Sequence, residues 1–150
     1  MFMNCIGNML TPLIAVIATW IAYQQFHTNR LKLKFDMYDK RLKIYQALMD
    51  FIATVTSLPE MKVEEVKKFD VARSESVFLF GKDIPQYLQT VRDQAAAITM
   101  LNSQIKELMS DERIPARTDL VNEKLKIIDW FYKQVEVAQE KFSRYLAFEF

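Results

Sequence analysis

The stretch TPLIAVIATWIAYQQFHTNRLKLKFDMYDKRLKIYQ, residues 11–46, decides the fold, because it passes from apolar to highly charged with no turn residue after Pro12. The first charged side chain of the chain is Arg30. From Phe2 to Tyr23 the residues are mostly apolar. As a helix rising about 1.5 Å per residue, this segment covers roughly 33 Å, the thickness of one bilayer core. The sequence therefore predicts one helix that begins as a membrane span and continues into a charged region.

Basic residues follow the predicted span directly, namely Arg30, Lys32 and Lys34. Cytoplasmic flanks of membrane helices are enriched in Lys and Arg, so we expect a single-pass membrane protein with its amino terminus outside and its carboxyl-terminal bulk in the cytoplasm. A cleaved signal peptide is the alternative, but a basic leading region and a convincing cleavage site are missing. The predicted domains are a transmembrane helix, 1–26, and a cytoplasmic helical bundle, 27–150.

The composition argues against catalysis and against a disulfide-stabilised fold. The chain has one cysteine, two glycines and four prolines, which favours helices in a reducing compartment. His27 is the only histidine, and CxxC motifs, Gly-rich phosphate loops and Ser–His arrangements are missing from the sequence. We therefore predict that the protein is not an enzyme and needs no cofactor or metal.

Beyond the predicted span, apolar residues recur at intervals of three and four, the pattern of an amphipathic helix. In the first cytoplasmic helix they are Leu31, Phe35, Tyr38, Leu42, Tyr45, Met49 and Ile52. Three breaks follow, at SLPE (57–60), FLFGKDIPQ (78–86) and SDERIPARTD (110–119). We expect Ser57 to begin a capping box and Gly81 to adopt a left-handed conformation. The predicted fold class is all-α: one amino-terminal transmembrane helix continuing into a cytoplasmic antiparallel helical bundle.

A seam of small or polar residues runs along the predicted span at steps of four and three, the spacing of a supercoiled helix contact. Its members are Asn4, Asn8, Thr11, Ala15, Ala18 and Ala22. Lipid gives no hydrophobic gain for burying alanine, so the seam predicts packing against other helices. Each chain supplies one span, so we expect a homo-oligomer. In a symmetric ring the seam lines a pore; the alternative is a dry packing contact.

The densest positive charge lies just after the predicted span. Its candidate ligand-binding residues are Arg30, Lys32, Lys34, Lys40 and Arg41. Repeated around an oligomer axis, these side chains would form a basic vestibule for an anionic or nucleic-acid ligand. The alternative is that they only set the topology and contact anionic lipid headgroups.

Three stretches carry a resemblance: NRLKLKFDMYDKRLKIYQALMDFI (29–52), SVFLFGKDIPQYLQTVRDQA (76–95) and EKFSRYLAF (140–148). They resemble a group of small bacterial single-span membrane proteins with a KLKLDLFDRRF-like helix and an FLFG break. That group is similar to the membrane effectors of the Hailong anti-phage system. The resemblance implies a channel in antiviral defence, held closed by a nucleotide or DNA oligomer that a partner nucleotidyltransferase makes.

Together these features favour a homo-oligomeric membrane effector that forms a gated ion pore. A membrane-anchored adaptor that recruits a cytosolic partner without conduction is the alternative. A membrane-bound nucleic-acid binder without conduction is a third possibility.

Overall fold

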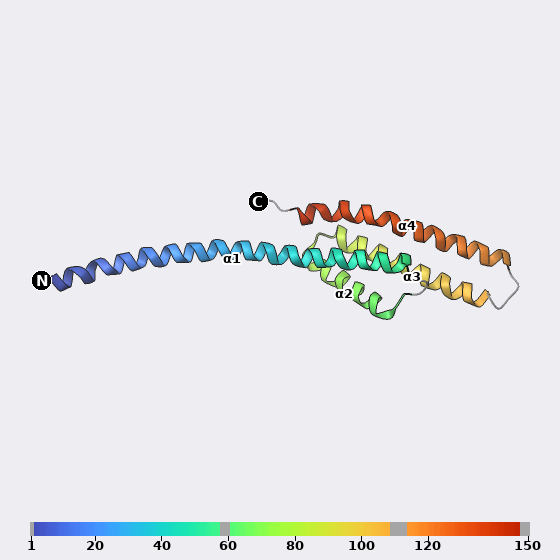
Figure 1. Cartoon of the computed structure of the whole chain (residues 1–150), viewed down its shortest axis with the longest axis horizontal. Coiled ribbons are helices and arrows are strands. Elements are labelled where there is room, and N and C mark those ends of the chain that lie inside the picture. The colour runs from blue at the N-terminus through green and yellow to red at the C-terminus, as the bar shows by residue number, and fades with distance from the viewer. Residues whose placement is uncertain (1, 58–60, 109–113, 148–150) are drawn as a thin grey trace. The chain divides into compact units, whose positions relative to one another are not determined.

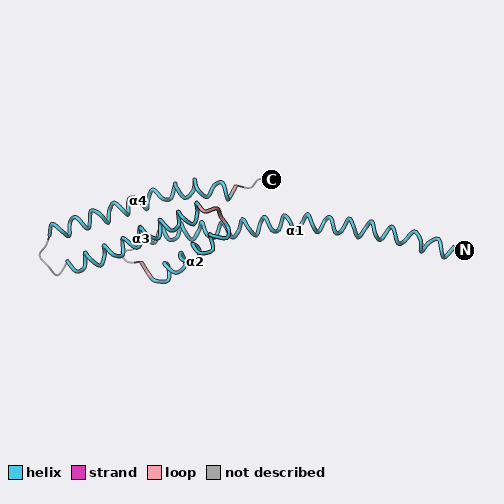
Figure 2. Tube along the Cα trace, turned by 180° about the vertical axis from the view of Figure 1, so that it is seen from behind, coloured by secondary structure: helices cyan, strands magenta, loops and turns pink. Residues whose placement is uncertain are grey.

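A computed structural model describes the backbone of residues 2–57, 61–108 and 114–147, with side chains from Leu13 in the first helix and from Ala116 in the last. Figure 1 shows four helices, which are α1 (Phe2–Ser57), α2 (Val63–Leu79), α3 (Asp83–Leu108) and α4 (Ile114–Leu146). The described residues contain no strand (Figure 2). The predicted all-α class is therefore confirmed.

The chain divides into two compact units, Met1–Met37 and Tyr38–Phe150. Helix α1 contributes residues to both, and it is helical throughout its length. Among the described residues, no helix combines the length and the apolar character needed to cross a membrane. The side chains of residues 1–12, about half of the predicted span, lie outside the part of the chain that the structure describes. The predicted domain boundary between residues 26 and 27 concerns the membrane and stays a prediction.

In the second unit, the face of α1 that packs against the other helices is shifted by one residue from the predicted face. The residues that are almost fully buried are Ile44, Leu48, Phe51 and Val55, at steps of four, three and four. One residue corresponds to about 100° of rotation around a helix. Leu42, Tyr45 and Met49 of the predicted stripe are only half-buried, whereas Ile52 is buried as predicted. Leu31 and Phe35 belong to the first unit and are exposed.

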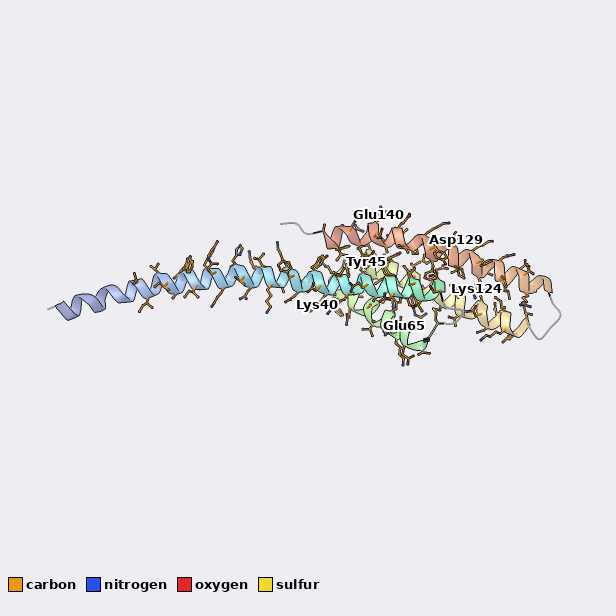
Figure 3. The ribbon with its side chains drawn as sticks, in the orientation of Figure 1. Lys40, Tyr45, Glu65, Lys124, Asp129 and Glu140 are labelled. Atoms are coloured by element: carbon orange, nitrogen blue, oxygen red, sulfur yellow. The ribbon has the colours of Figure 1, made fainter. Side chains whose placement is uncertain are left out.

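Aromatic rings join α1 to both α2 and α4. Phe51 stacks nearly parallel on Phe69 of α2, with ring centroids 4.1 Å apart. Tyr45 contacts Phe142 of α4 with centroids 5.4 Å apart, and it lies between these helices in Figure 3. Phe69 and Phe142 are almost fully buried, so these pairs add ring contacts to a large buried apolar area.

The break between α1 and α2 differs from the prediction. Ser57 is the last residue of α1, so it does not begin a capping box. The residue that precedes α2 is Lys62, whose side chain makes no capping hydrogen bond. Val63 is exposed, and α2 instead buries Phe69, Ala72 and Ser76.

Helices α3 and α4 each depart from the periodicity of their apolar residues in two places. Along α3, the predicted core residues Leu88, Val91, Ala95, Ile98 and Leu101 are buried, but Ile105 and Leu108 of the same repeat are only half-buried. On α4, Phe131, Ala138 and Phe142 are buried as expected, but Leu125 is 56% exposed and Val135 is 37% exposed.

The buried face of α4 includes Gln134, which hydrophobic periodicity does not identify. Its side-chain Nε2 donates to the backbone carbonyl of Trp130, and its backbone carbonyl accepts a hydrogen bond from Tyr87 Oη at 3.4 Å. A buried polar group is tolerated when it has such partners. Burial also raises the pKa of Tyr87 well above its ordinary value, and the nearby Tyr45 adds to this effect.

Candidate functional site

The described part of the predicted span exposes apolar side chains on every side of the helix. Leu13, Ile14, Val16 and Ile17 are each at least 50% exposed. Successive helical residues point about 100° apart, so these four large side chains cover a little under half of the circumference, and the exposed side chains of Ala15 and Ala18 lie on the remainder. Trp20 is also 61% exposed. A helix that is apolar all round needs an apolar environment, either a protein core or a membrane.

The predicted seam is described only in its second half. Asn4, Asn8 and Thr11 lie outside the described side chains, while Ala15, Ala18 and Ala22 are exposed.

Beside the seam, Ala15 and Thr19 form a hollow with Val16, Trp20 and Tyr23. The Thr19 hydroxyl donates to the carbonyl of Ala15 at 2.8 Å, so its hydrogen bond lies within its own helix. This surface can therefore receive a neighbouring helix without leaving that donor unsatisfied.

Four of the five predicted ligand residues are exposed. The Arg30 guanidinium lies over the ring of Phe26, 4.7 Å from its centroid. Lys32, Lys34 and Lys40 are exposed, and within the described part of the chain their ammonium groups form no ion pair. These three lysines are therefore the charges most available to an anion.

Arg41, the fifth predicted ligand residue, is instead engaged inside the second unit. Its Nε donates to the carbonyl of Leu79 at 2.9 Å, and its Nη1 donates to the carbonyl of Tyr145 at 3.4 Å. The guanidinium also lies over the rings of Phe80 and Tyr145. Arg41 thus joins α1 to the carboxyl ends of α2 and α4, where helix carbonyls lack intrahelical partners.

Asp83, at the start of α3, holds the same region from the other side. Tyr145 Oη donates to its Oδ1 at 2.8 Å, and Arg144 Nη2 donates to its Oδ2 at 2.6 Å. Desolvation raises the pKa of Asp83, but the Tyr145 hydrogen bond, backbone N–H groups and the Arg144 charge outweigh it. The pKa of Asp83 is therefore below its ordinary value. We call Arg41, Phe80, Asp83, Arg144 and Tyr145 the Arg41 cluster.

A glycine is required at position 81 because side-chain atoms of the cluster approach its Cα closely, and not because its backbone is left-handed. No glycine in the described residues has a positive φ, contrary to the expectation for this turn. A Cβ atom at Gly81 would lie 2.8 Å from Tyr145 Oη and 2.9 Å from Asp83 Oδ1. The absence of a side chain therefore lets the FLFG turn pack against α4.

This cluster could not be predicted as a unit from the sequence. Its residues come from the three stretches that carry the resemblance, which contribute Arg41, Asp83 and Tyr145. Asp83 lies next to the FLFG break and Tyr145 lies near the end of α4, but no local signal marks Arg41, which lies inside α1.

The described residues contain no cluster of His, Cys, Asp and Glu suited to hold a metal ion. Comparison of the chain with protein-family models, with curated proteins and with solved structures found no match.

Proposed function

We propose that this protein is a single-pass membrane protein of the bacterial inner membrane that self-associates and forms a gated ion pore. Its amino terminus would lie outside, and its helical bundle would lie in the cytoplasm. An anionic ligand, either a nucleotide or a DNA oligomer from a partner nucleotidyltransferase, would hold the pore closed. Opening would depolarise the membrane, which suits an effector of anti-phage defence.

The observation that carries the proposal is the apolar surface around α1 in the first unit. Leu13, Ile14, Val16 and Ile17 expose large apolar side chains on one side of the helix, and the small apolar residues Ala15 and Ala18 lie on the other. An uncharged and mostly apolar sequence precedes these residues, back to Phe2. A bilayer covers such a surface without any further protein.

Support for self-association comes from the hollow at Ala15 and Thr19. Small residues let two helix backbones approach closely, and larger neighbours such as Trp20 provide side chains that can enter the hollow of another copy. A pore rather than a dry contact would follow if the polar residues Asn8 and Thr11 faced the axis of the assembly.

Support for the ligand comes from Lys32, Lys34 and Lys40, which are exposed and lack ion-pair partners within the described residues. Arg41 is removed from the proposed ligand set, because its Nε and Nη1 already donate to carbonyl groups within the second unit. The remaining proposed contacts are Arg30 and the three lysines.

The test of conduction is ion efflux from liposomes that contain the purified full-length protein. We expect efflux from the wild type and its loss in Ala15→Phe, because a ring fills the hollow at the helix contact. Ile14→Phe is the matched control, since it enlarges an exposed apolar side chain outside the hollow and should keep efflux. Membrane insertion and oligomer formation without efflux would instead favour the adaptor function.

The test of the ligand is binding of a fluorescent single-stranded DNA oligomer to the protein in detergent, measured by anisotropy. Lys32→Gln with Lys34→Gln should weaken binding and reduce its salt dependence, because fewer counterions are released. Lys67→Gln, a neutralisation of an exposed lysine on α2, is the control and should leave binding unchanged. Equal binding by all variants would refute the proposed basic vestibule.

A further inference from the structure

Arg30 has a side-chain direction that is fixed by an aromatic contact. Its guanidinium lies over the ring of Phe26, one turn earlier in α1, with 4.7 Å between Cζ and the ring centroid. Helical side chains lean toward the amino terminus, and the cation–π contact holds the Arg30 side chain in this direction. The positive charge of Arg30 therefore lies near the level of Phe26, toward the predicted span.

Two further aromatic side chains precede Phe26 on α1. Trp20 and Tyr23 are 61% and 67% exposed, and they follow the apolar residues of the predicted span. Trp and Tyr are enriched where a membrane helix passes from the acyl chains to the headgroups. Under the proposed function, Tyr23 therefore marks the end of the hydrocarbon layer on the cytoplasmic side.

Depth along α1 separates Arg30 from the lysine that follows it. The headgroup layer is roughly 5–8 Å thick on each side of a bilayer. With a rise of about 1.5 Å per residue, Phe26 lies about 4.5 Å beyond Tyr23, whereas Lys32 lies about 14 Å beyond it. The guanidinium of Arg30 would thus lie among the headgroups, and Lys32 would lie at or beyond their outer edge.

The charges near Arg30 leave it open to an anion from outside the chain. Asp36 is the first acidic residue in the sequence. It lies four residues after Lys32 and on the same side of α1, whereas Arg30 points about 120° away from it. Lys34 follows Arg30 by one turn and adds a second positive charge on its side. A phosphate at the headgroup level would therefore meet Arg30 without a competing carboxylate from the first unit.

We propose that Arg30 binds the phosphate of an anionic phospholipid in the cytoplasmic leaflet, while Phe26 holds the guanidinium at that depth. A guanidinium can donate two parallel hydrogen bonds to one phosphate while its face stacks on an aromatic ring. A dissolved nucleotide or DNA oligomer would have to displace headgroups to reach the same position. This inference rests on the proposed membrane insertion, and it narrows the proposed ligand set to Lys32, Lys34 and Lys40.

The test measures which phospholipid lies next to Trp20. Full-length protein with Trp130→Phe, which leaves Trp20 as the sole tryptophan, is reconstituted in vesicles of phosphatidylcholine and phosphatidylglycerol. In separate samples one of the two lipids carries brominated acyl chains, which quench tryptophan fluorescence. Trp20 lies about 9 Å from Phe26 along the helix axis, so it meets the acyl chains of a lipid whose phosphate is at Arg30. The ratio of the two quenching efficiencies gives the preference for the anionic lipid.

We expect the protein with Arg30 to prefer phosphatidylglycerol, and Arg30→Gln to reduce this preference roughly fivefold, the effect of one basic group near an anionic surface. Lys32→Gln is the matched control, because it removes one positive charge two residues later. At about 150 mM salt the Debye length is about 8 Å, so Lys32→Gln should change the preference by less than about twofold. Inorganic phosphate in the buffer should leave the preference unchanged.

Equal losses of preference in Arg30→Gln and Lys32→Gln would show general charge attraction and overturn the lipid site. Loss of the preference on addition of inorganic phosphate would show a site for free phosphate and overturn it too. An unchanged preference in Arg30→Gln, with weaker binding of the fluorescent DNA oligomer by this variant, would return Arg30 to the proposed ligand set. Absence of quenching by either brominated lipid would show that α1 is not inserted, and it would overturn the proposed function as well.

Discussion

Removal of the Arg41 side chain should destabilise the second unit, although Arg41 looks from the sequence like one more juxtamembrane cation. Arg41→Ala removes the hydrogen bonds to the carbonyls of Leu79 and Tyr145 and the contacts with two aromatic rings. A hydrogen bond from a charged donor contributes roughly 1.5–3 kcal/mol, and a partly buried cation–π contact contributes about 0.5–1 kcal/mol.

The site is only part-buried and the second hydrogen bond is long, so the contributions fall at the low end of these ranges and are not additive. We expect the free energy of unfolding to fall by about 2–3 kcal/mol, mainly from the Nε hydrogen bond. The assay is urea unfolding of the full-length protein in mild detergent, followed by Trp130 fluorescence. A Trp20→Phe background makes Trp130 the sole tryptophan.

Lys40→Ala is the matched control, because it removes the same charge from the adjacent residue, which is exposed. Its unfolding free energy should change by less than about 0.5 kcal/mol, as for other surface substitutions. Equal effects of the two variants would refute a structural role for Arg41 and restore it to the ligand candidates.

Three further predictions concern the cluster and the core, and the same unfolding assay tests them. Gly81→Ala should lower the unfolding free energy by about 1–3 kcal/mol through overpacking, and by less in a Tyr145→Phe background, which lacks the closest oxygen. Additive effects of these two changes would contradict the close approach. The pKa of Asp83 is lowered in the folded protein, so its carboxylate stabilises the fold above the ordinary value of 3.8 and loses that effect as the pH falls through the folded pKa. The stability difference between wild type and Asp83→Asn should therefore shrink as the pH falls from about 5 toward the folded pKa, and a constant difference would refute this. Phe69→Ala should cost about 3–5 kcal/mol, whereas Phe78→Ala, at an exposed position, should cost less than about 0.5 kcal/mol.

The fold class and the helix breaks followed from the sequence because they depend on local properties. The FLFG break separates α2 from α3, with Asp83 and Pro85 in the first turn of α3. The core of α3, from Leu88 to Leu101, matches its periodicity. These features need only the helical repeat and the conformational limits of proline and glycine.

The errors came from contacts between distant segments. The buried face of α1 depends on the side chains that α2 and α4 place opposite it. Phe51 belongs to this face because it stacks on Phe69 of α2. Burial of the Gln134 side chain is tolerated because its Nε2 donates to the backbone carbonyl of Trp130, a contact that hydrophobic periodicity does not reveal.

The candidate site shows the same limit. Charge density alone grouped Arg41 with Lys40, although one is bound to two carbonyls and the other is exposed. The role of Gly81 also depends on Tyr145, which lies far away in sequence. Neither the contacts of Arg41 nor the close approach of Gly81 and Tyr145 could be predicted from the local sequence pattern.

The hydrogen bond from Thr19 to Ala15 has a consequence for the order of biogenesis. Under the proposed function, a hydroxyl that is already satisfied within its own helix would impose no penalty while a newly inserted chain diffused alone in lipid. Insertion and oligomer assembly would then be separate steps in time, with a stable monomeric precursor between them. A cell could accumulate such chains safely and form the proposed pore only at a sufficient surface density.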